Sequence, residues 1–337
     1  MTTMHDIAKE AGVSSATVSR VLNNKSSTIP ISPKTRDKVL SIAKELGYQP
    51  NLMARSLRTK KTYTIGVVLW DLTDHFFSEI LGGIEQAVDE SGYNLLLTTP
   101  EADMGRELVC LEKLRNFRTD GILIVGGAMS YGKEQLNELG IDTRTVVLIG
   151  TRAENADVSS ITVDNTTGGY IGAEYLIKRG CRALVYITGR DKTIDMKDRL
   201  EGVRQAIKTY DFQDRSVILE QGPGEEQGYE AAERVLKDLE LPAAIFGVND
   251  ITALGIIRAV RDRHLRIPQD AAVLGFDDLP MASYTEPRLS TVHQPRFQMG
   301  RNGAMLLLEL LSKKESGSPE EYLSRVLDPK LVIRESS

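Results

Sequence analysis

Several short polar side chains near the amino terminus fall on one face of a short predicted helix. Thr17, Ser19 and Arg20 can all donate hydrogen bonds, and the small residues Ser15 and Ala16 stand beside them. A helix face of this kind fits the major groove of DNA, where the base edges present donors, acceptors and methyl groups. The chemistry that these residues indicate is therefore direct contact with DNA bases.

Two short helices joined by a tight turn would present this face. We expect Thr3 to cap the first helix with Asp6 as its capping-box partner, and Gly12 to end it in a left-handed conformation. Ser14 is expected to cap the second helix. Apolar residues of the two helices face each other: Ile7, Ala8 and Ala11 from the first, and Val18, Val21 and Leu22 from the second. This pattern predicts a helix-turn-helix, and a helical hairpin that only packs stays open as the alternative.

A third predicted helix completes the amino-terminal unit. It begins after Ser32 with Pro33, a capping residue followed by proline at the first helical position, and stops at Gly47. Its apolar face is expected to hold Val39, Ile42, Ala43 and Leu46. Residues 51–58 offer one or two further turns, too few for a stable helix in isolation, and residues 59–62 are expected to form a linker.

The distribution of charge separates this unit from the rest of the chain. The net charge is −5 over 337 residues, but residues 1–62 carry 11 Lys and Arg against four acids, which gives +7 and leaves −12 for the remainder. A basic head on an acidic body suits a head that contacts phosphates. No run approaches the roughly 20 apolar residues of a membrane helix, and no apolar signal core opens the sequence. We expect a cytoplasmic protein with Cys110 and Cys181 as buried free thiols.

From Tyr63 onward, short apolar runs alternate with amphipathic segments. The expected strands are 65–69, 95–98, 121–125, 146–149, 183–187, 217–219, 243–246 and 271–276. The expected helices are 78–90, 106–117, 168–179, 198–209, 227–239 and 251–263. Alternation of this kind predicts parallel sheets covered by helices on both faces, and the length of the segment indicates two lobes rather than one sheet.

No catalytic or cofactor motif accompanies this pattern. Gly126-Gly127 and Ile149-Gly150 follow strands, but they form neither a dinucleotide fingerprint nor a phosphate-binding loop. Gly168-Gly169 after Asp164 is more simply the start of a capped helix. The scattered histidines form no metal or triad motif: His5, His75, His264 and His293. The sequence therefore predicts no enzyme, no cofactor and no metal.

Motifs along the whole chain resemble the lactose/galactose repressor (LacI/GalR) family of bacterial transcription regulators, and they occur in the family's order. The matching segments are 3–23, 32–36, 46–51, 54–57, 65–68, 120–122, 249–250, 253–255, 275–278 and 294–295. The resemblance implies a small all-α helix-turn-helix head and an α/β body like a periplasmic binding protein, built of two Rossmann-like lobes. By the same analogy, an effector binds in the crevice at the carboxyl ends of the strands.

The resemblance also implies boundaries. The head would cover residues 1–50, the hinge helix and linker 51–62, and the effector-binding and dimerisation body 63–337. The first lobe would comprise about 63–162 and 293–320, the second about 163–291 and 322–337, with crossover strands near 161–165, 290–294 and 318–324.

The DNA-binding residues that the resemblance implies lie in the head and the hinge. They are Thr3, Ser14, Ser15, Ala16, Thr17, Ser19, Arg20, Asn23, Asn51, Arg55, Leu57 and Arg58. Arg20 could pair with a guanine through two hydrogen bonds, with a phosphate contact as the alternative, and Ala16 would contact a thymine methyl. Leu57 matches a hinge leucine that wedges into the minor groove, with packing under the linker as the alternative. Residues 24–31 form a loop about three residues longer than is usual in the family.

The effector-binding residues implied by the resemblance are Asp74, Phe76, Arg199, Asn249 and Asp277. Asp74 could equally cap the helix that follows it, and Asp277 could equally orient its own loop. Pro223 stands where relatives often stack an aromatic ring on the ligand, which weakens the case for a sugar or purine held by stacking. The effector is expected to be a small polar metabolite such as a sugar.

These inferences combine into a homodimeric transcription regulator, most simply a repressor, whose two heads bind a pseudo-palindromic operator. Effector binding would reorient the lobes and the hinges. No leucine-rich heptad follows residues 331–333, which favours a dimer over a tetramer. A transporter's solute-binding protein shares the body but does not explain residues 1–62, and a sugar-processing enzyme needs catalytic groups that the sequence does not offer.

Overall fold

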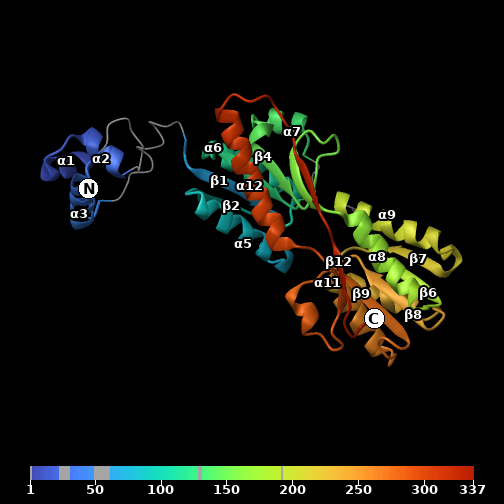
Figure 1. Cartoon of the computed structure of the whole chain (residues 1–337). Helices are drawn as coiled ribbons and strands as arrows, with labels where there is room; N and C mark the ends of the chain where they lie inside the picture. Colours follow the sequence, from blue (N-terminus) through green and yellow to red (C-terminus); the bar gives the residue numbers. More distant parts are fainter. Residues whose placement is uncertain (1, 23–30, 49–60, 128–130, 191–192) are drawn as a thin grey trace. The chain divides into compact units, whose positions relative to one another are not determined.

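The computed structural model describes residues 2–22, 31–48, 61–127, 131–190 and 193–337 (Figure 1). The chain divides into two compact units, Met1–Thr62 and Tyr63–Ser337, here called the head and the body. No helix in the described ranges is long and apolar enough to cross a membrane.

Local capping signals determine the ends of the helices in the head, which are α1 (Met4–Ala11), α2 (Ser15–Leu22) and α3 (Pro33–Glu45). The predicted capping box is confirmed: the Asp6 backbone N–H donates to Thr3, and the Thr3 N–H donates to Asp6 Oδ2 at 2.9 Å. Gly12 ends α1 with a left-handed φ of 69°. Ser14 Oγ accepts from the Thr17 N–H at 3.1 Å at the start of α2.

The core of the head forms from one face of each helix, as predicted, with one exception. Its buried residues are Ile7, Ala8, Ala11, Val18, Val21, Val39, Ile42 and Ala43. The prediction that Leu46 joins this core is wrong, because α3 ends at Glu45 and Leu46, in the cap position, is 39% exposed. The predicted hinge helix at 51–58 lies outside the described residues.

Two six-stranded sheets form the body, each the centre of one lobe. The first has the order β11-β5-β4-β3-β1-β2, with β1 Thr64–Leu69, β2 Asn94–Thr98, β3 Gly121–Val125, β4 Val146–Ile149, β5 Ser159–Val163 and β11 Ser324–Leu327. The second has the order β12-β10-β9-β8-β6-β7, with β6 Ala183–Thr188, β7 Ser216–Glu220, β8 Ala243–Gly247, β9 Ala271–Asp277, β10 Ser290–His293 and β12 Lys330–Val332. Neighbouring strands are parallel except β10 and β12, an antiparallel pair that the sequence pattern did not predict.

Helices cover both faces of each sheet, as the alternating pattern predicts. The first lobe carries α5 His75–Glu90, α6 Met104–Asn116, α7 Lys133–Glu138, α12 Arg296–Glu315 and the short η1 Thr143–Thr145. The second carries α8 Asn165–Lys178, α9 Ile194–Thr209, α10 Glu225–Val235, α11 Asp250–Asp262 and the short η2 Gln213–Arg215 and η3 Pro280–Ser283. Each lobe has one apolar cluster on either face of its sheet. The sequence pattern missed α7 and α12.

Three chain segments join the lobes. The chain passes from β5 to α8 after Val163 and from β10 to α12 after His293. The third passage, drawn in red in Figure 1, follows β11. The expectation of a third crossing at 318–324 is wrong, because residues 324–327 still pair with β5 in the first sheet and the chain enters the second sheet only at Lys330. The expected start of the last second-lobe segment at 322 is too early for the same reason.

Pairs of glycines let helices pack in direct backbone contact at three places. A Cβ on Gly169 of α8 would lie 2.1 Å from the Arg199 carbonyl oxygen of α9, and one on Gly202 would lie 1.9 Å from the Thr166 carbonyl oxygen. The pairs α5–α12 and α10–α11 repeat this arrangement through Gly83 with Gly300 and Gly228 with Gly255. Asp164 caps α8 as predicted, but the glycines after it serve close helix packing, which places α9 against the second sheet.

Candidate functional site

A cavity of about 570 Å³ lies where the carboxyl ends of the strands of both lobes meet. Crevices at this end of parallel sheets are the usual ligand sites of such folds. The first lobe contributes Trp70, Thr73, Asp74, His75, Phe76, Phe77, Gly126, Gly127, Gly150, Thr151 and Val163. The second lobe and the crossings contribute Asn165, Thr193, Asp195, Met196, Arg199, Pro223, Gly224, Glu225, Asn249, Ile251, Asp277, Met281 and Gln294. All five residues predicted to bind an effector are in this set, and their role in binding stays a prediction.

Arg199 is held firmly at the second-lobe wall of the cavity. Its side chain is buried, and its guanidinium lies 3.8 Å from the centroid of the Phe276 ring. Nε donates to Asn165 Oδ1 at 2.9 Å and Nη1 to the Val248 carbonyl oxygen at 2.7 Å. Carboxylate oxygens of Asp195 and Asp277 each lie 3.6 Å from it. These contacts within the protein fix the position of the guanidinium at the cavity wall.

Asp277 ends β9 in a backbone conformation that side chains rarely adopt. Its φ is 115° and that of Asp278 is 56°, so the surroundings must compensate for strain. Arg296 donates to the carbonyl oxygens of both residues and lies 3.1 Å from Glu79 Oε1 of the first lobe. The Asp277 carboxylate accepts from Gln294 Nε2 at 2.6 Å. The loop is thus held through its main chain, while the carboxylate faces Arg199 and Gln294.

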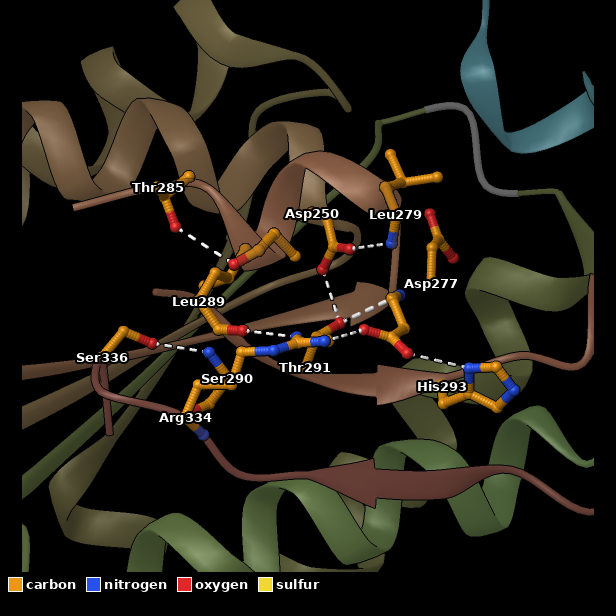
Figure 2. A network of polar contacts seen from close by, with 12 residues as sticks. Asp250, Asp277, Leu279, Thr285, Leu289, Ser290, Thr291, His293, Arg334 and Ser336 are labelled. Atoms are coloured by element: carbon orange, nitrogen blue, oxygen red, sulfur yellow. Dashed lines mark hydrogen bonds and ion pairs between the residues drawn. The ribbon is translucent and has the colours of Figure 1, made fainter. Parts of the chain in front are cut away.

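A buried polar network behind the cavity anchors the end of β9 (Figure 2). Asp250 is fully buried; Oδ2 accepts from the Leu279 N–H at 2.7 Å and Oδ1 from Thr291 Oγ1 at 2.5 Å. Asp278 forms an ion pair with Arg334 at 2.6 Å, and its Oδ2 lies 2.9 Å from His293 Nδ1. Figure 2 shows Asp250, Thr291, His293 and Arg334 joined by a continuous set of polar contacts. Because every member contacts another, the network fixes the position from which Asp277 reaches the cavity.

Burial changes the acidity of these carboxyl groups. Desolvation raises the pKa of Asp277 to about 7, against the opposing effect of Arg199, and also raises the pKa of Asp250. An acid with a raised pKa binds its proton more tightly in the folded than in the unfolded chain. The free energy of unfolding should therefore fall as the pH rises from about 4, where an unfolded aspartate loses its proton, to about 7.

We expect Asp277→Asn to flatten this fall in stability between about pH 4 and pH 7, since the amide does not titrate. Urea unfolding of the full-length protein can be followed at each pH through Trp70, the only tryptophan in the chain. Asp238→Asn, at an exposed position, is the matched control and should keep the wild-type slope. An Asp277→Asn variant with the wild-type slope would contradict the raised pKa.

Two of the predicted site residues also cap helices that begin at the cavity. Asp74 Oδ1 accepts from the Phe76 N–H at 2.8 Å, and burial raises the pKa of Asp74. Asn249 Oδ1 accepts from the backbone N–H and the hydroxyl of Thr252, at 2.8 and 2.7 Å. The capping alternative for Asp74 is therefore confirmed. The same residue also lines the cavity. Since its oxygen is engaged in the cap, Asn249 can offer a ligand its amide nitrogen.

Sequence reasoning missed several groups on the cavity wall. Trp70, Asn165, Asp195 and Gln294 all line it. Trp70 directly follows the predicted strand 65–69, so its position at a strand end was a usable signal. Pro223 lies on the wall as the resemblance implied. The structure adds Trp70, and the predicted Phe76 lies on the wall with it; both are aromatic groups of the opposite lobe, which the argument from Pro223 did not consider.

The predicted DNA-contacting face of α2 is accessible in the head. Ser15 and Ala16 are exposed, while Thr17, Ser19 and Arg20 are half-buried. Arg20 Nε donates to the Ala16 carbonyl oxygen at 3.4 Å. Thr3 and Ser14 are exposed and serve as helix caps. Asn23, Asn51, Arg55, Leu57 and Arg58 lie outside the described residues, so their part in DNA binding stays a prediction.

A helix-turn-helix head joined to a two-lobed body around a cavity defines a ligand-responsive DNA-binding transcription regulator. Residues 3–51 match the family model of bacterial regulatory proteins of the lacI family, and residues 173–337 match a periplasmic binding protein-like domain. The chain is 34% identical to the transcriptional regulator RegA of Clostridium saccharobutylicum over 100% of this chain and 99% of that one. It is 33% identical to the HTH-type transcriptional repressor PurR of Haemophilus influenzae (strain PittEE), over 100% of this chain and 98% of that one. The chain therefore belongs to the lacI family.

Solved structures agree with this assignment. The Lac repressor dimer bound to operator and the anti-inducer ONPF superimposes with a TM-score of 0.84 at 26% identity, covering 99% of this chain and 98% of that one. A complex of the transcriptional regulator CelR with cellobiose gives 0.71 at 28%, covering 100% of both chains. The predicted family, the predicted fold class and the function as a DNA-binding transcription regulator are confirmed.

Proposed function

We propose that this regulator is a cytoplasmic homodimer that represses transcription from a pseudo-palindromic operator, and that an uncharged polyhydroxy compound such as a sugar controls it from the interlobe cavity. The observation that carries the proposal is the cavity itself, where the preorganised Arg199–Asp277 pair of one lobe faces aromatic groups of the other. Structural relatives support it: CelR binds cellobiose, and a regulator from Enterococcus faecium at 25% identity binds ribose.

The charge of the cavity wall favours a neutral ligand. Four carboxyl groups line it, from Asp74, Asp195, Glu225 and Asp277, whereas Arg199 is the sole arginine or lysine among the lining residues that the structure describes. Both Asp195 and Asp277 already lie near Arg199. A phosphate or carboxylate would enter beside carboxyl groups that outnumber the single arginine, and each of them that is ionised repels an anion. Hydroxyl groups can instead donate to carboxylates, which are strong acceptors.

Apolar side chains suit the ring of such a compound. Trp70 and Phe76 come from the first lobe, and Met196, Pro223 and Met281 from the second. Aromatic surfaces pack against the C–H faces of a sugar ring while the carboxylates accept from its edge. A ligand that contacts both lobes would bind one arrangement of the lobes more tightly than another. Only such a difference in affinity lets a ligand shift the equilibrium between the arrangements. The shift would pass to the heads through the hinges at 51–62.

The DNA contacts in this proposal come from α2 and the hinge. Arg20 would read a guanine and Ala16 a thymine methyl in the major groove. Leu57 of each subunit would wedge into the minor groove at the centre of the operator. This activity needs no catalytic group, so we infer a binding protein rather than an enzyme.

The choice of a neutral ligand is tested by pairs of compounds. We expect sugars such as glucose, ribose or cellobiose to raise the melting temperature of the full-length protein in a thermal-shift panel, while the phosphate esters of the same sugars do not. Every pair keeps the sugar ring, and the ester carries a charged phosphate group in place of one hydroxyl hydrogen. A phosphate ester that stabilises the protein more than its parent sugar would refute a neutral effector.

Arg199→Lys should weaken binding of the best sugar from that panel about tenfold to a hundredfold. Lysine keeps the charge but lacks the planar set of donors that now contacts Asn165, Val248 and Asp277. Alanine is a poorer choice, because it would leave buried carboxyl groups unpaired and destabilise the lobe. Trp70 fluorescence provides the titration signal, and DNA affinity without sugar should be largely retained.

Arg204→Lys, at an exposed position of the same helix, is the matched control and should bind the sugar like the wild type. Equal sugar affinities of the Arg199→Lys and Arg204→Lys variants would show that Arg199 does not take part in binding.

A further inference from the structure

One ion pair joins the two lobes at the edge of the cavity. Arg152 lies just after β4 in the first lobe, next to the cavity-lining Thr151. Asp198 lies on α9 in the second lobe, next to Arg199. Nη1 of Arg152 contacts one carboxylate oxygen of Asp198, and Nη2 donates to the other at 3.1 Å. Both carboxylate oxygens are therefore engaged, the paired geometry in which arginine binds a carboxylate most strongly.

The position of this pair makes it sensitive to the arrangement of the lobes. The chain crosses between the lobes after Val163, after His293 and after Leu327. Arg296, beside the second crossing, also contacts both lobes, through Glu79 and through the carbonyl oxygens of residues 277 and 278. That contact lies beside the second crossing, so it can persist when one lobe rotates against the other. Arg152 and Asp198 are not themselves part of a crossing, although Arg199 beside Asp198 contacts Asn165 just after the first one. Because the two partners belong to different lobes, a rotation of the lobes changes the distance between them.

The surroundings strengthen the attraction without burying it. The side chain of Arg152 is 44% exposed and that of Asp198 is 25% exposed, so the desolvation penalty is small. The hydrogen-bonded carboxylate of Asp198 raises the pKa of the Arg152 guanidinium, and Asp195, one turn earlier on α9, adds attraction from a distance. The pair thus favours lobe contact at this point and remains open to screening by salt.

We propose that the Arg152–Asp198 ion pair is a latch that holds the two lobes in the arrangement seen here, independently of any bound ligand. A contact made in only one of two arrangements shifts the population toward that arrangement. An ion pair with this exposure shifts such an equilibrium about two- to fivefold. The latch thereby determines how far the lobes are already closed when an effector arrives.

Quenching of Trp70 by acrylamide tests the latch in the full-length, ligand-free protein. Trp70 is the only tryptophan and lines the cavity between the lobes, so opening exposes it to the quencher. We expect Arg152→Asp and Asp198→Arg, each alone, to raise the quenching constant, because each places like charges opposite one another. The double variant with both changes restores an opposite pair and should return to the wild-type constant. High salt should raise the wild-type constant toward that of the single variants.

The control is an ion pair within one lobe. Arg182 and Glu240 are exposed at 3.3 Å from each other in the second lobe, so Arg182→Glu should leave the quenching constant unchanged. Circular dichroism identifies any variant that fails to fold, and spin labels at the exposed Glu112→Cys and Lys208→Cys positions measure the interlobe distance directly. Longer distances in the single variants and recovery in the double variant support the latch. Single variants with wild-type quenching and distance, or a double variant that stays open, overturn it.

Discussion

We expect the full-length protein to lose about a thousandfold in DNA affinity between about 50 and 200 mM salt, the loss typical of about six neutralised phosphates. The physical reason is the release of counterions when the basic head, with a net charge of +7, binds the DNA backbone. Lys9, Lys34, Lys38 and Lys44 are exposed on the head and available for such contacts. Titration of a duplex selected from a random library, at a series of salt concentrations, provides the slope.

The body provides the control for this experiment. Residues 63–337 form a compact unit of their own with a net charge of −12, so a protein restricted to them should stay folded and bind no DNA. Leu57→Ala in the full-length protein should reduce affinity for the selected duplex far more than for a scrambled one, because nonspecific binding depends on Lys and Arg. DNA binding retained by residues 63–337 would contradict the assignment of the head, and equal losses on both duplexes would contradict the wedge.

Gly83→Ala should destabilise the first lobe by at least about 3 kcal/mol, at or above the upper end of the usual range for overpacking. The added Cβ would lie 2.1 Å from the Phe297 carbonyl oxygen and 2.8 Å from the Arg301 backbone nitrogen, both on α12. Backbone atoms cannot rotate away as a side chain can, so α5 and α12 must separate. Their separation opens the apolar cluster that both helices share with the first sheet. Urea unfolding followed by Trp70 fluorescence measures the loss.

The neighbouring glycine is the matched control for that substitution. Gly82 is exposed on the same helix, and a Cβ there meets no atom within 4 Å. Gly82→Ala should therefore be neutral or stabilising by up to about 1 kcal/mol, the gain in helix propensity of alanine over glycine. Similar effects of the two substitutions would show that α5 and α12 do not pack by direct backbone contact.

The sequence by itself determined the features that depend on neighbours a few residues apart. The caps formed by Thr3, Ser14 and Ser32 appear as predicted because a cap is a contact between residues three positions apart. The strands from β1 to β4 and from β6 to β9 match the predicted runs to within one residue at each end, because buried parallel strands are continuous apolar runs. Arg199 and Asp277 could be named from motifs because these local segments carry the resemblance to the family.

Several helices begin earlier than the apolar pattern suggested. The expected helix 78–90 begins at His75, and the expected helix 198–209 begins at Ile194. The first turn of each helix lies at the cavity and carries apolar residues of its own, Phe76 and Phe77 in α5 and Ile194 and Met196 in α9. The expected helices therefore cover the later turns and leave out the first turn, which lines the cavity.

Only the tertiary structure decided the features that join distant segments. No local signal distinguishes Gly82 from Gly83, and the difference comes from α12, more than two hundred residues away. Because β11 pairs with β5, the third crossing lies after residue 327 and not at the predicted 318–324. Trp70 and Arg199 line the same cavity from different lobes, and Arg152 pairs with Asp198 of the other lobe, for the same reason. Local interactions join residues a few positions apart, so the spacing of residues along the chain predicts them. Contacts between lobes depend on how the two folded sheets lie against each other, and residue spacing does not predict that.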